Sequence, residues 1–571
     1  MKVDVLTRSY NNARTGANDA ETTLTPATVA SSGLRKLFSL PITDDARGVE
    51  AQPLIVPDIT MPDGTRHDVV YLCSMANTIW AFDANDGTQL WPNPVSLGVP
   101  INNTKQIDSW SINDHWGILS TPVIDLDTET MYVVGYSSAD GTQNNASYHL
   151  HAIALQDGKD RKAPIIVQGT MQNSAGQQVS LGQLQKQRAA LLLTKTGQGP
   201  NQHKTVYVAF TGGERPGAPH GWVVAFDVEA FQQSAAWAAT PNGWGGGIWQ
   251  GSQGPSADEE GRVYLMTGNG SWDGIMDFAE SLTKLEYTAG PAGTATLVPV
   301  DWFTPFTDES RAPLLNDRGY DWTDQDLGSA GPVFLGSLGL VVGAGKDGIL
   351  YVLDRNNLGK TRPADLANPA QNYKKLKSPP IFFTYFPGWS ISPAPPDAKD
   401  LNFFSADLKT HHLHASPLFW NDPSSGPMLF CWGENESLRA WSIDANGVVT
   451  FLAKGWEIAS FGCVGPSGHG GMPGGLLCVS GNAQQPHSAI VWALAPITGD
   501  ANSSVVEGIL RAYDATQFDS NPDGSKTLRL LWDSKRIPGN TFSHNKFGVP
   551  VVANGKVYVP TYDGRVDVYG L

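Results

Sequence analysis

Short runs of apolar residues alternate with turn residues along the whole chain of 571 residues. The runs recur in a fixed order: a strand of the Pro-Val type, a strand of the Val-Tyr-Val type and a strand of the Ala-x-Asp type. The clearest third strand is "IWAFDANDGTQLW" at 79–91, where an Asp-Gly turn precedes Trp91. Asp-Gly makes a tight turn, and the Trp can then pack flat between neighbouring sheets. Such a repeat is typical of a β-propeller, in which each unit forms one sheet.

The last unit is one strand short, whereas "RKLFSLPI" at 35–42 precedes the first unit as an unpaired strand. We therefore expect residues 35–42 to complete the last sheet, so that the ring closes without an exposed edge. The sequence predicts an all-β fold with one domain, a single eight-bladed β-propeller over residues 1–571. The eight first strands, which line the centre, are expected at 51–56, 119–125, 188–193, 254–258, 331–335, 415–420, 474–480 and 548–553.

Longer segments lie between these strands. Residues 105–117, 302–326, 361–410 and 481–506 are expected to be loops that cover one face of the propeller. Long loops in a compact domain are often functional, so ligands are expected at that face.

Composition narrows the classes of partner. The formal net charge is −16, and no run of Lys and Arg interleaved with aromatic residues occurs, which excludes a nucleic-acid partner. The same charge disfavours anionic membranes. No apolar stretch approaches the roughly 18 residues that span a bilayer, so no membrane insertion is expected. These properties are compatible with a small-molecule substrate, the expected partner, and they do not indicate the oligomeric state.

The cysteines and the N-terminus bear on the compartment. The chain has 4 Cys without Cys-x-x-Cys spacing, which disfavours a zinc ribbon or covalent haem, and most of them lie in apolar strands as buried free thiols. The opening "MKVDVLTRSYNN" has no apolar signal core. We expect a periplasmic or secreted protein if an export signal has been removed, and a cytoplasmic one otherwise.

One strand ends in an unusual way, in "YLMTGNGSWDG" at 264–274. A strand that ends in Gly-Asn-Gly lets the backbone approach a ligand closely, and Asn269 offers a neutral oxygen suited to Ca²⁺. The alternative is a turn asparagine that tolerates an unusual backbone angle.

Three segments together resemble the quinoprotein alcohol dehydrogenases, eight-bladed propellers that bind pyrroloquinoline quinone (PQQ) and calcium on their axis. "GGGIW" at 245–249 resembles the triple-glycine turn before the Trp under the quinone ring, which implies Trp249 as the stacking floor. "TGNGSW" resembles the stretch whose Asn binds calcium, which implies Asn269. "DWTDQDLGSAGPVFL" and the following "AGKDGILYVLDR" resemble the segments of the base and of a lysine at a quinone oxygen, which implies Asp324 or Asp326, and Lys346.

A fourth segment, "TGGERPGAPHGWVVAFD" at 211–227, resembles the one that carries a calcium-binding glutamate, here Glu214, although its spacing differs. The resemblance as a whole implies a calcium-assisted, PQQ-type oxidoreductase of an alcohol or sugar. Glu214, Asn269 and Asp324 would hold Ca²⁺, an aspartate would take the alcohol proton, and Lys346 would stabilise the developing negative charge.

The sequence also departs from this family. The dehydrogenases carry two adjacent cysteines above the quinone, and no adjacent pair exists here. The corresponding stretch is "NDHWGILSTPVID" at 113–125, which implies a different cap, His115 or Trp116. The ends of the chain are closest to bacterial PQQ-binding-like propeller repeat proteins of unassigned activity. The resemblance therefore predicts the fold more directly than it predicts the cofactor.

Plainer interpretations stay open. Trp249 could plug the channel, Lys346 could be a solvated turn residue, and Asp324 and Asp326 could belong to an acidic solvated loop. "RSYNNARTG" at 8–16 could fold across the mouth or act only as a closing tail.

The "THHLHASP" stretch allows a different chemistry. On a strand His412 and His414 point the same way, and such a pair can ligate Zn²⁺ or Cu²⁺, position a substrate or simply be buried. Two rival functions follow: a quinone-free propeller that serves as an interaction module, and an enzyme of other chemistry at the same mouth, such as a lyase, a cyclase or a metal-dependent enzyme.

Overall fold

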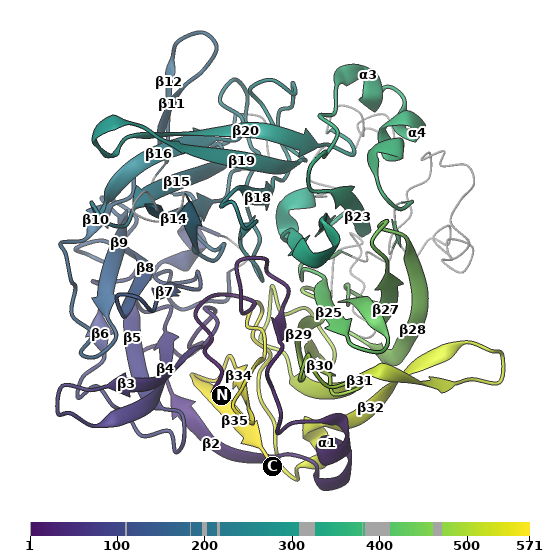
Figure 1. Cartoon of the computed structure of the whole chain (residues 1–571). Helices are drawn as coiled ribbons and strands as arrows, with labels where there is room; N and C mark the ends of the chain where they lie inside the picture. The colour runs from purple at the N-terminus through teal and green to yellow at the C-terminus, as the bar shows by residue number, and fades with distance from the viewer. Residues whose placement is uncertain are drawn as a thin grey trace.

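The computed structural model describes residues 2–108, 111–182, 184–196, 203–213, 217–307, 326–379, 381–382, 412–460 and 471–571. The chain is all-β and has a propeller fold, in which sheets are arranged around a central axis (Figure 1). The α-helices among these residues are short: α1 (Pro26–Ser32), α3 (Pro363–Leu366) and α4 (Pro369–Asn372). No helix in the described part of the chain is long and apolar enough to cross a membrane.

Six antiparallel sheets of four strands account for most of the described strands. Five of them are up-and-down meanders of consecutive strands, and the sixth combines the two ends of the chain. Their strands are β3 (Leu54–Thr60), β4 (Arg66–Cys73), β5 (Thr78–Asp83) and β6 (Val95–Ser96); β7 (Val123–Asp125), β8 (Thr130–Ser137), β9 (Ser147–Ala154) and β10 (Ile165–Ile166); β13 (Leu192–Thr196), β14 (His203–Phe210), β15 (Trp222–Asp227) and β16 (Gln232–Ala238); β17 (Ser256–Ala257), β18 (Val263–Met266), β19 (Leu282–Ala289) and β20 (Ala295–Phe303); β21 (Val333–Leu335), β22 (Leu340–Ala344), β23 (Ile349–Asp354) and β24 (Ile381–Phe382); and β33 (Val551–Ala553), β34 (Lys556–Pro560), β35 (Arg565–Gly570) and β2 (Arg35–Pro41).

Two further four-strand units are joined in a nine-stranded sheet through one parallel pair, Lys454 with Thr527. The short strand β1 (Ala17–Asn18) extends this sheet at β29, and a separate hairpin is formed by β11 (Thr170–Gln172) and β12 (Gln178–Ser180). The two units are β25 (Leu418–Asp422), β26 (Gly426–Cys431), β27 (Ser437–Ile443) and β28 (Val449–Ile458), and β29 (Leu476–Ser480), β30 (Ile490–Pro496), β31 (Gly508–Ser520) and β32 (Lys526–Asp533).

The sequence located the first strands well, but parts of the predicted loops form regular structure: α3, α4 and β24 lie within 361–410. Each predicted first strand overlaps an observed one, and β2 pairs with β35 from Arg35 opposite Gly570 to Pro41 opposite Arg565. The prediction of a loop over 481–506 is wrong in its centre, because Ile490–Pro496 forms β30 in the middle of its sheet. This strand is buried on both faces and reads as a continuous apolar run without alternation, which weakens the strand signal.

The first strand of each unit lies innermost, and neighbouring first strands contact one another, as β7 does β13 and β13 does β17. Adjacent strands are antiparallel, so the loop that enters a first strand lies at the same end as the turn between the second and third strands. These loops and turns form one face, which we call the mouth. The opposite face is formed by the far ends of the first and third strands.

Residues 3–16 wind around the axis inside the innermost strands (Figure 1). The segment touches the first strand of every unit, or the residue after it, and thus covers inner edges that would otherwise lack hydrogen bonds. Residues 8–16 therefore occupy the channel rather than fold across the mouth. Three of the bonds are donated by the segment: Val3 N to the Asn554 side chain, Val5 N to the Ile55 carbonyl and Asn12 Nδ2 to the Leu193 carbonyl. The others are accepted by its carbonyls: Leu6 from Ile124 N, Asn12 from Ala257 N, Ala13 from Phe334 N, Thr15 from Phe419 N and Gly16 from Val479 N.

Large side chains fill the space between neighbouring sheets. Trp91, predicted to pack between sheets, is buried, and its indole N–H donates to the Gln156 carbonyl of the next unit at 3.2 Å. Its ring is tilted by 53° to Tyr71 rather than stacked flat. Cys73, Cys431 and Cys478 are buried free thiols, as predicted, and burial raises the pKa of Cys431 and Cys478 to about 12.

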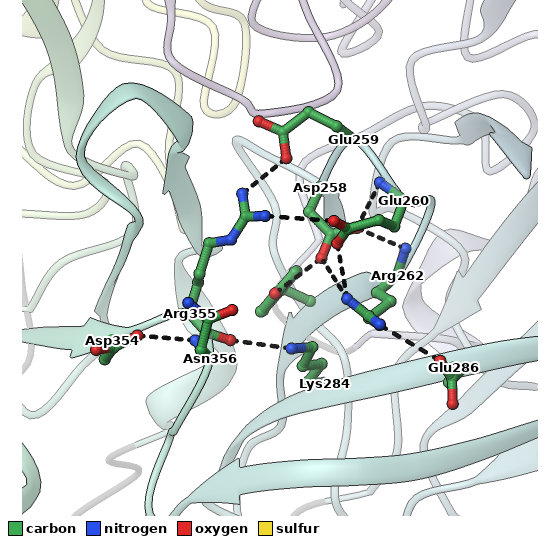
Figure 2. Close-up of polar contacts among 10 residues, drawn as sticks. Asp258, Glu259, Glu260, Arg262, Lys284, Glu286, Asp354, Arg355 and Asn356 are labelled. Atoms are coloured by element: carbon green, nitrogen blue, oxygen red, sulfur yellow. Dashed lines mark hydrogen bonds and ion pairs between the residues drawn. The ribbon is translucent and has the colours of Figure 1, made fainter.

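A network of charged side chains links two units at the face opposite the mouth (Figure 2). Arg355 donates to Glu259 at 2.7 Å, and Lys284 donates to the Arg355 carbonyl at 2.9 Å. Arg262 pairs with Glu260 at 2.7 Å and with Glu286 at 3.3 Å. These three glutamates are exposed, so each of their pairs contributes little to stability, whereas Asp258, 3.8 Å from Arg262, is buried. The bonds of Arg355 join β17–β20 to β21–β24.

Candidate active site

The segments singled out by their glycines and charges meet at the mouth. Gly246 N donates to the Asn269 carbonyl at 2.7 Å, and Gly268 N donates to the Gly247 carbonyl at 2.8 Å. Lys346 N donates to the Asp326 carbonyl at 2.9 Å. The loops that carry Trp249, Asn269, Asp326 and Lys346 are therefore held together by main-chain hydrogen bonds, although they come from different hairpins.

Glycine is required where these loops touch. Gly246 has a φ of +69°, which favours glycine. A Cβ on Gly268 would lie 2.0 Å from Asp326 Oδ1. The glycines before and after Asn269 thus serve the close approach of neighbouring loops, whereas Asn269 itself does not have the positive φ of the turn alternative.

Asp326 and Lys346 form a buried ion pair. Lys346 Nζ donates to Asp326 Oδ2 at 2.8 Å, and Asn269 N donates to Asp326 Oδ1 at 3.0 Å. The side chain of Asp326 is 1% exposed and that of Lys346 is 12% exposed. Lys346 is thus not a solvated turn residue, and both oxygens of Asp326 accept hydrogen bonds. Asp324 and Glu214, the other predicted acidic residues, lie outside the described residues.

Aromatic rings and basic groups gather beside this pair. Lys186 Nζ lies 4.8 Å from the ring centroid of half-buried Trp249 and 5.8 Å from that of buried Trp116. The Arg188 guanidinium lies 5.3 Å from the Trp116 ring and 4.6 Å from the Phe547 ring. Cations over aromatic faces are attracted by the ring quadrupole. Trp116 and Trp249, which the sequence placed above and below a ligand, are thus joined through Lys186.

Acidic and polar side chains hold these cations in place. Arg188 is paired with Glu50, which is fully buried and also accepts from the Tyr562 hydroxyl. Lys186 Nζ donates to Asp108 Oδ2 at 2.9 Å. Lys546 Nζ donates to Asn502 at 2.7 Å and lies 5.3 Å from the Phe547 ring. Burial, with Arg188 nearby, lowers the pKa of Lys546 to about 8.

Sequence reasoning missed Glu50, Lys186, Arg188 and Lys546. A signal for them exists: each is a charged residue at, or a few positions before, the start of a predicted first strand. Because all first strands begin at the mouth, charges at these positions converge there.

Gln250 is an unsatisfied polar residue at the same place. It follows Trp249, is fully buried, and neither side-chain oxygen nor nitrogen has a hydrogen-bond partner. Its amide nitrogen is 3.0 Å from where a Cβ on Gly331 would lie. A buried amide without hydrogen-bond partners lowers the stability of the fold. A bound ligand with a polar group beside Gln250 would supply the missing partners.

His115 and Trp116, the two predicted capping residues, have different surroundings. His115 Nδ1 is 2.8 Å from Asp45 Oδ2, at a surface pocket also lined by Arg47 and Tyr562. Trp116 is buried among the cations described above. Trp116 therefore belongs to the aromatic cluster, whereas His115 forms an ion pair at its edge.

Replacing His115 by Gln should remove a small pH dependence of stability. The hydrogen bond and charge of Asp45 raise the pKa of His115 above 6.5. A raised pKa in the folded state stabilises the fold fully below the unfolded-state pKa, and this stabilisation is lost as pH rises through the folded-state value. The stability difference between wild type and H115Q, about 1 kcal/mol at most for a partly exposed pair, should be largest at acidic pH. Urea unfolding across pH measures it, and a difference that grows toward alkaline pH would contradict it.

His412, His414 and Glu434 form a third cluster at the mouth. His414 Nε2 is 2.8 Å from Glu434 Oε1, and His412 Nδ1 is 3.8 Å from Glu434 Oε2. All three residues are buried. Sequence reasoning singled out the two histidines but missed Glu434.

Several solved structures have a similar fold. The quinohemoprotein alcohol dehydrogenase from Comamonas testosteroni matches 100% of this chain and 80% of its own, with 14% identity and a TM-score of 0.52. The quinohemoprotein alcohol dehydrogenase ADHIIG from Pseudomonas putida HK5 matches over the same shares, with 13% identity and a TM-score of 0.51. A europium-containing methanol dehydrogenase matches 100% of this chain and 98% of its own, with 13% identity and a TM-score of 0.51. No protein-family model and no curated protein matches the sequence. Identities at this level show a shared propeller fold.

Proposed function

We propose that this chain is a PQQ-type oxidoreductase that oxidises a small alcohol or sugar at the mouth of a single eight-bladed propeller domain. The six four-stranded sheets and the two four-strand units of the nine-stranded sheet support the blade count. The pairing of β2 with β35 supports closure by the N-terminal strand. That the similar structures are quinohemoprotein alcohol dehydrogenases and a methanol dehydrogenase supports the reaction class.

The gathering of rings and basic groups at the mouth carries this proposal. PQQ is a flat ring system with several carboxylates, and such a ligand is recognised by aromatic faces together with cations. Trp249 offers a half-buried ring beside Lys186, and Arg188 and Lys546 flank the Phe547 ring. Glu50 and Asp108 offset part of this charge and fix the cations. The residues present therefore fit a planar anionic ligand.

Calcium would be held by oxygen ligands at the mouth. Asn269 and Asp326 are oxygen donors of the kind Ca²⁺ prefers, but Asp326 already pairs with the Lys346 ammonium. The other proposed ligands, Glu214 and Asp324, lie outside the described residues. We propose that Ca²⁺ assists the reaction through Glu214, Asn269 and Asp324, with Asp326 engaged by Lys346.

PQQ, when bound, would supply the two-electron oxidising chemistry. Trp249 would orient it by stacking, and Lys186 would hold it through charge. Lys346 would donate a hydrogen bond to the ligand oxygen on which negative charge develops. Its ammonium is kept in position for this by its hydrogen bond to Asp326. Asp324 is the proposed acceptor of the alcohol proton. Asp326 is the second candidate for that role, although two hydrogen bonds suit it better to positioning Lys346.

Calorimetric titration of the metal-stripped protein with PQQ, with and without Ca²⁺, tests the proposal. Wild type should bind PQQ with micromolar or tighter affinity, more tightly with Ca²⁺, and should gain thermal stability because the ligand binds only the folded state. Trp249→Ala should weaken PQQ binding at least about tenfold, the size of a lost aromatic contact. Trp456→Ala is the matched control, since Trp456 is 73% exposed on the outer strand β28.

Absence of both heat and a shift in melting temperature in the wild type would refute the quinoprotein proposal. Equal losses in the Trp249 and Trp456 variants would refute the placement of the ring at Trp249. The first result would favour a quinone-free propeller that acts as an interaction module, on the same fold.

A further inference from the structure

The geometry of His412, His414 and Glu434 points to a binding site for one divalent first-row transition-metal ion, which we propose as a site separate from the quinone proposal. Each residue offers one ligand atom, and the three atoms lie within 4.8 Å of one another. Among the described residues this is the one group of three or more His, Cys, Asp or Glu side chains that meets this limit. Two imidazoles and a carboxylate suit zinc and related ions, and zinc sites with three protein ligands keep a fourth position open.

The fold explains why these residues meet. β25 and β26 form an antiparallel hairpin in which Leu418 lies opposite Phe430. Unchanged, this register would place His414 opposite Glu434, but beyond β25 and β26 it shifts by two residues, so that Glu434 lies opposite His412. Glu434 N in fact donates to the His412 carbonyl at 3.0 Å, so the two segments continue side by side. His412 and His414 both point toward the glutamate, since each contacts one of its two carboxylate oxygens.

The distances fit a metal with small side-chain movements. With metal–nitrogen and metal–oxygen distances of about 2.0–2.2 Å, neighbouring ligand atoms of a tetrahedral site lie about 3.4 Å apart. The contacts of Glu434 with His414 and His412, at 2.8 and 3.8 Å, lie on either side of this value. Rotation of the carboxylate would bring both distances closer to this value, with the metal between Glu434 and the two histidines.

The surroundings prearrange the ligands. The carbonyl of His414 accepts from the Ser252 hydroxyl, and the carbonyl of Leu413 accepts from the Ser329 hydroxyl at 2.7 Å. Leu413 N donates to Gly345, next to Lys346. The histidine segment is therefore fastened on both sides by other units, and the three ligand side chains are each less than 6% exposed. Buried carboxylates and imidazoles held this way are typical of ion sites, since a metal compensates the buried charge.

Binding of Zn²⁺ to the metal-stripped protein, without PQQ or Ca²⁺, tests this site. We expect one Zn²⁺ per chain by calorimetry and by metal analysis after dialysis. Glu434→Gln, which keeps the size of the side chain, and His414→Ala should each weaken binding at least about 100-fold, beyond the 10–100-fold typical of outer-shell partners. His149→Ala is the matched control, because His149 and His151 form a similar pair on β9 with ring centroids 6.4 Å apart, and it should leave Zn²⁺ affinity unchanged.

Co²⁺ titration of the wild type gives a readout that does not depend on the folding of any variant. Ligand-field absorption of low-symmetry, nitrogen- and oxygen-bound Co²⁺, abolished by an equivalent of Zn²⁺, is expected. Absence of both Zn²⁺ binding and this absorption in the wild type would overturn the proposal, as would a folded E434Q variant with wild-type affinity. PQQ binding is measured separately, so either proposal can fail alone.

Discussion

Replacing Arg14 by alanine should lower the free energy of unfolding by about 3–5 kcal/mol, the largest stability effect expected of a single side chain here. Arg14 is fully buried inside the ring of first strands. Its guanidinium donates to the carbonyls of Pro255 at 3.0 Å and Leu191 at 2.8 Å, which belong to different units, and to Thr7 and Arg8 of its own segment.

The loss is large because several acceptors lose their donor together. Truncation leaves these buried oxygens unpaired and opens a cavity on the axis. Burial lowers the pKa of Arg14 to about 9, so part of the gain from its hydrogen bonds already offsets the cost of desolvation. Arg14 also has a φ of +60°, a strained conformation that its four-way bonding maintains.

Urea unfolding monitored by circular dichroism measures the loss, with Arg35→Ala as the control. Arg35 is exposed at the start of β2, so its truncation should change stability by no more than about 0.5 kcal/mol. If R14A unfolded at the same urea concentration as R35A, the hydrogen bonds of the Arg14 side chain would contribute nothing to the cohesion of the sheets.

The sequence predicted the propeller because repetition is a strong signal. Each unit carries its own apolar first strand and turn residues, so an error in one unit leaves the others readable. The central course of residues 3–16 could not be predicted in the same way. Its contacts are hydrogen bonds to the main chain of units far along the sequence, and main-chain acceptors leave no mark on residue identity.

The candidate site was predicted in part for a related reason. Trp249, Asn269 and Lys346 stand in glycine-rich motifs, whose backbone demands are visible in the sequence. Glu434 and Arg188 lie in segments without a recognisable motif. Glu434 reaches the site through the pairing of its hairpin, and Arg188 through the convergence of first strands at one face. Register is set by pairing, so a glutamate at the end of one strand acquires its histidine partners only once the hairpin is aligned.

Asp326→Asn should reduce PQQ-dependent, dye-linked alcohol oxidation about 100-fold or more, if the proposed function is correct. Asp326 accepts from the Lys346 ammonium at one oxygen and from Asn269 N at the other. An asparagine has one oxygen and one NH₂ group, so one donor must face another donor. Lys346 would lose the anion that holds its ammonium where negative charge develops, and the free energy of unfolding should fall by about 1–3 kcal/mol.

Asp422→Asn separates the catalytic effect from the loss of stability. Asp422 is also buried, and it accepts from the main-chain N–H groups of Ser424, Ser425 and His487 at 2.9–3.0 Å. It ends β25 at the face opposite the mouth, so its variant should lose comparable stability and keep the oxidation rate of wild type. Equal oxidation rates in folded D326N and D422N would show that Asp326 only packs the loops together. A loss confined to D326N would mean that the buried pair with Lys346 serves the reaction, because both variants remove a buried acceptor but only one lies beside the rings and cations of the mouth.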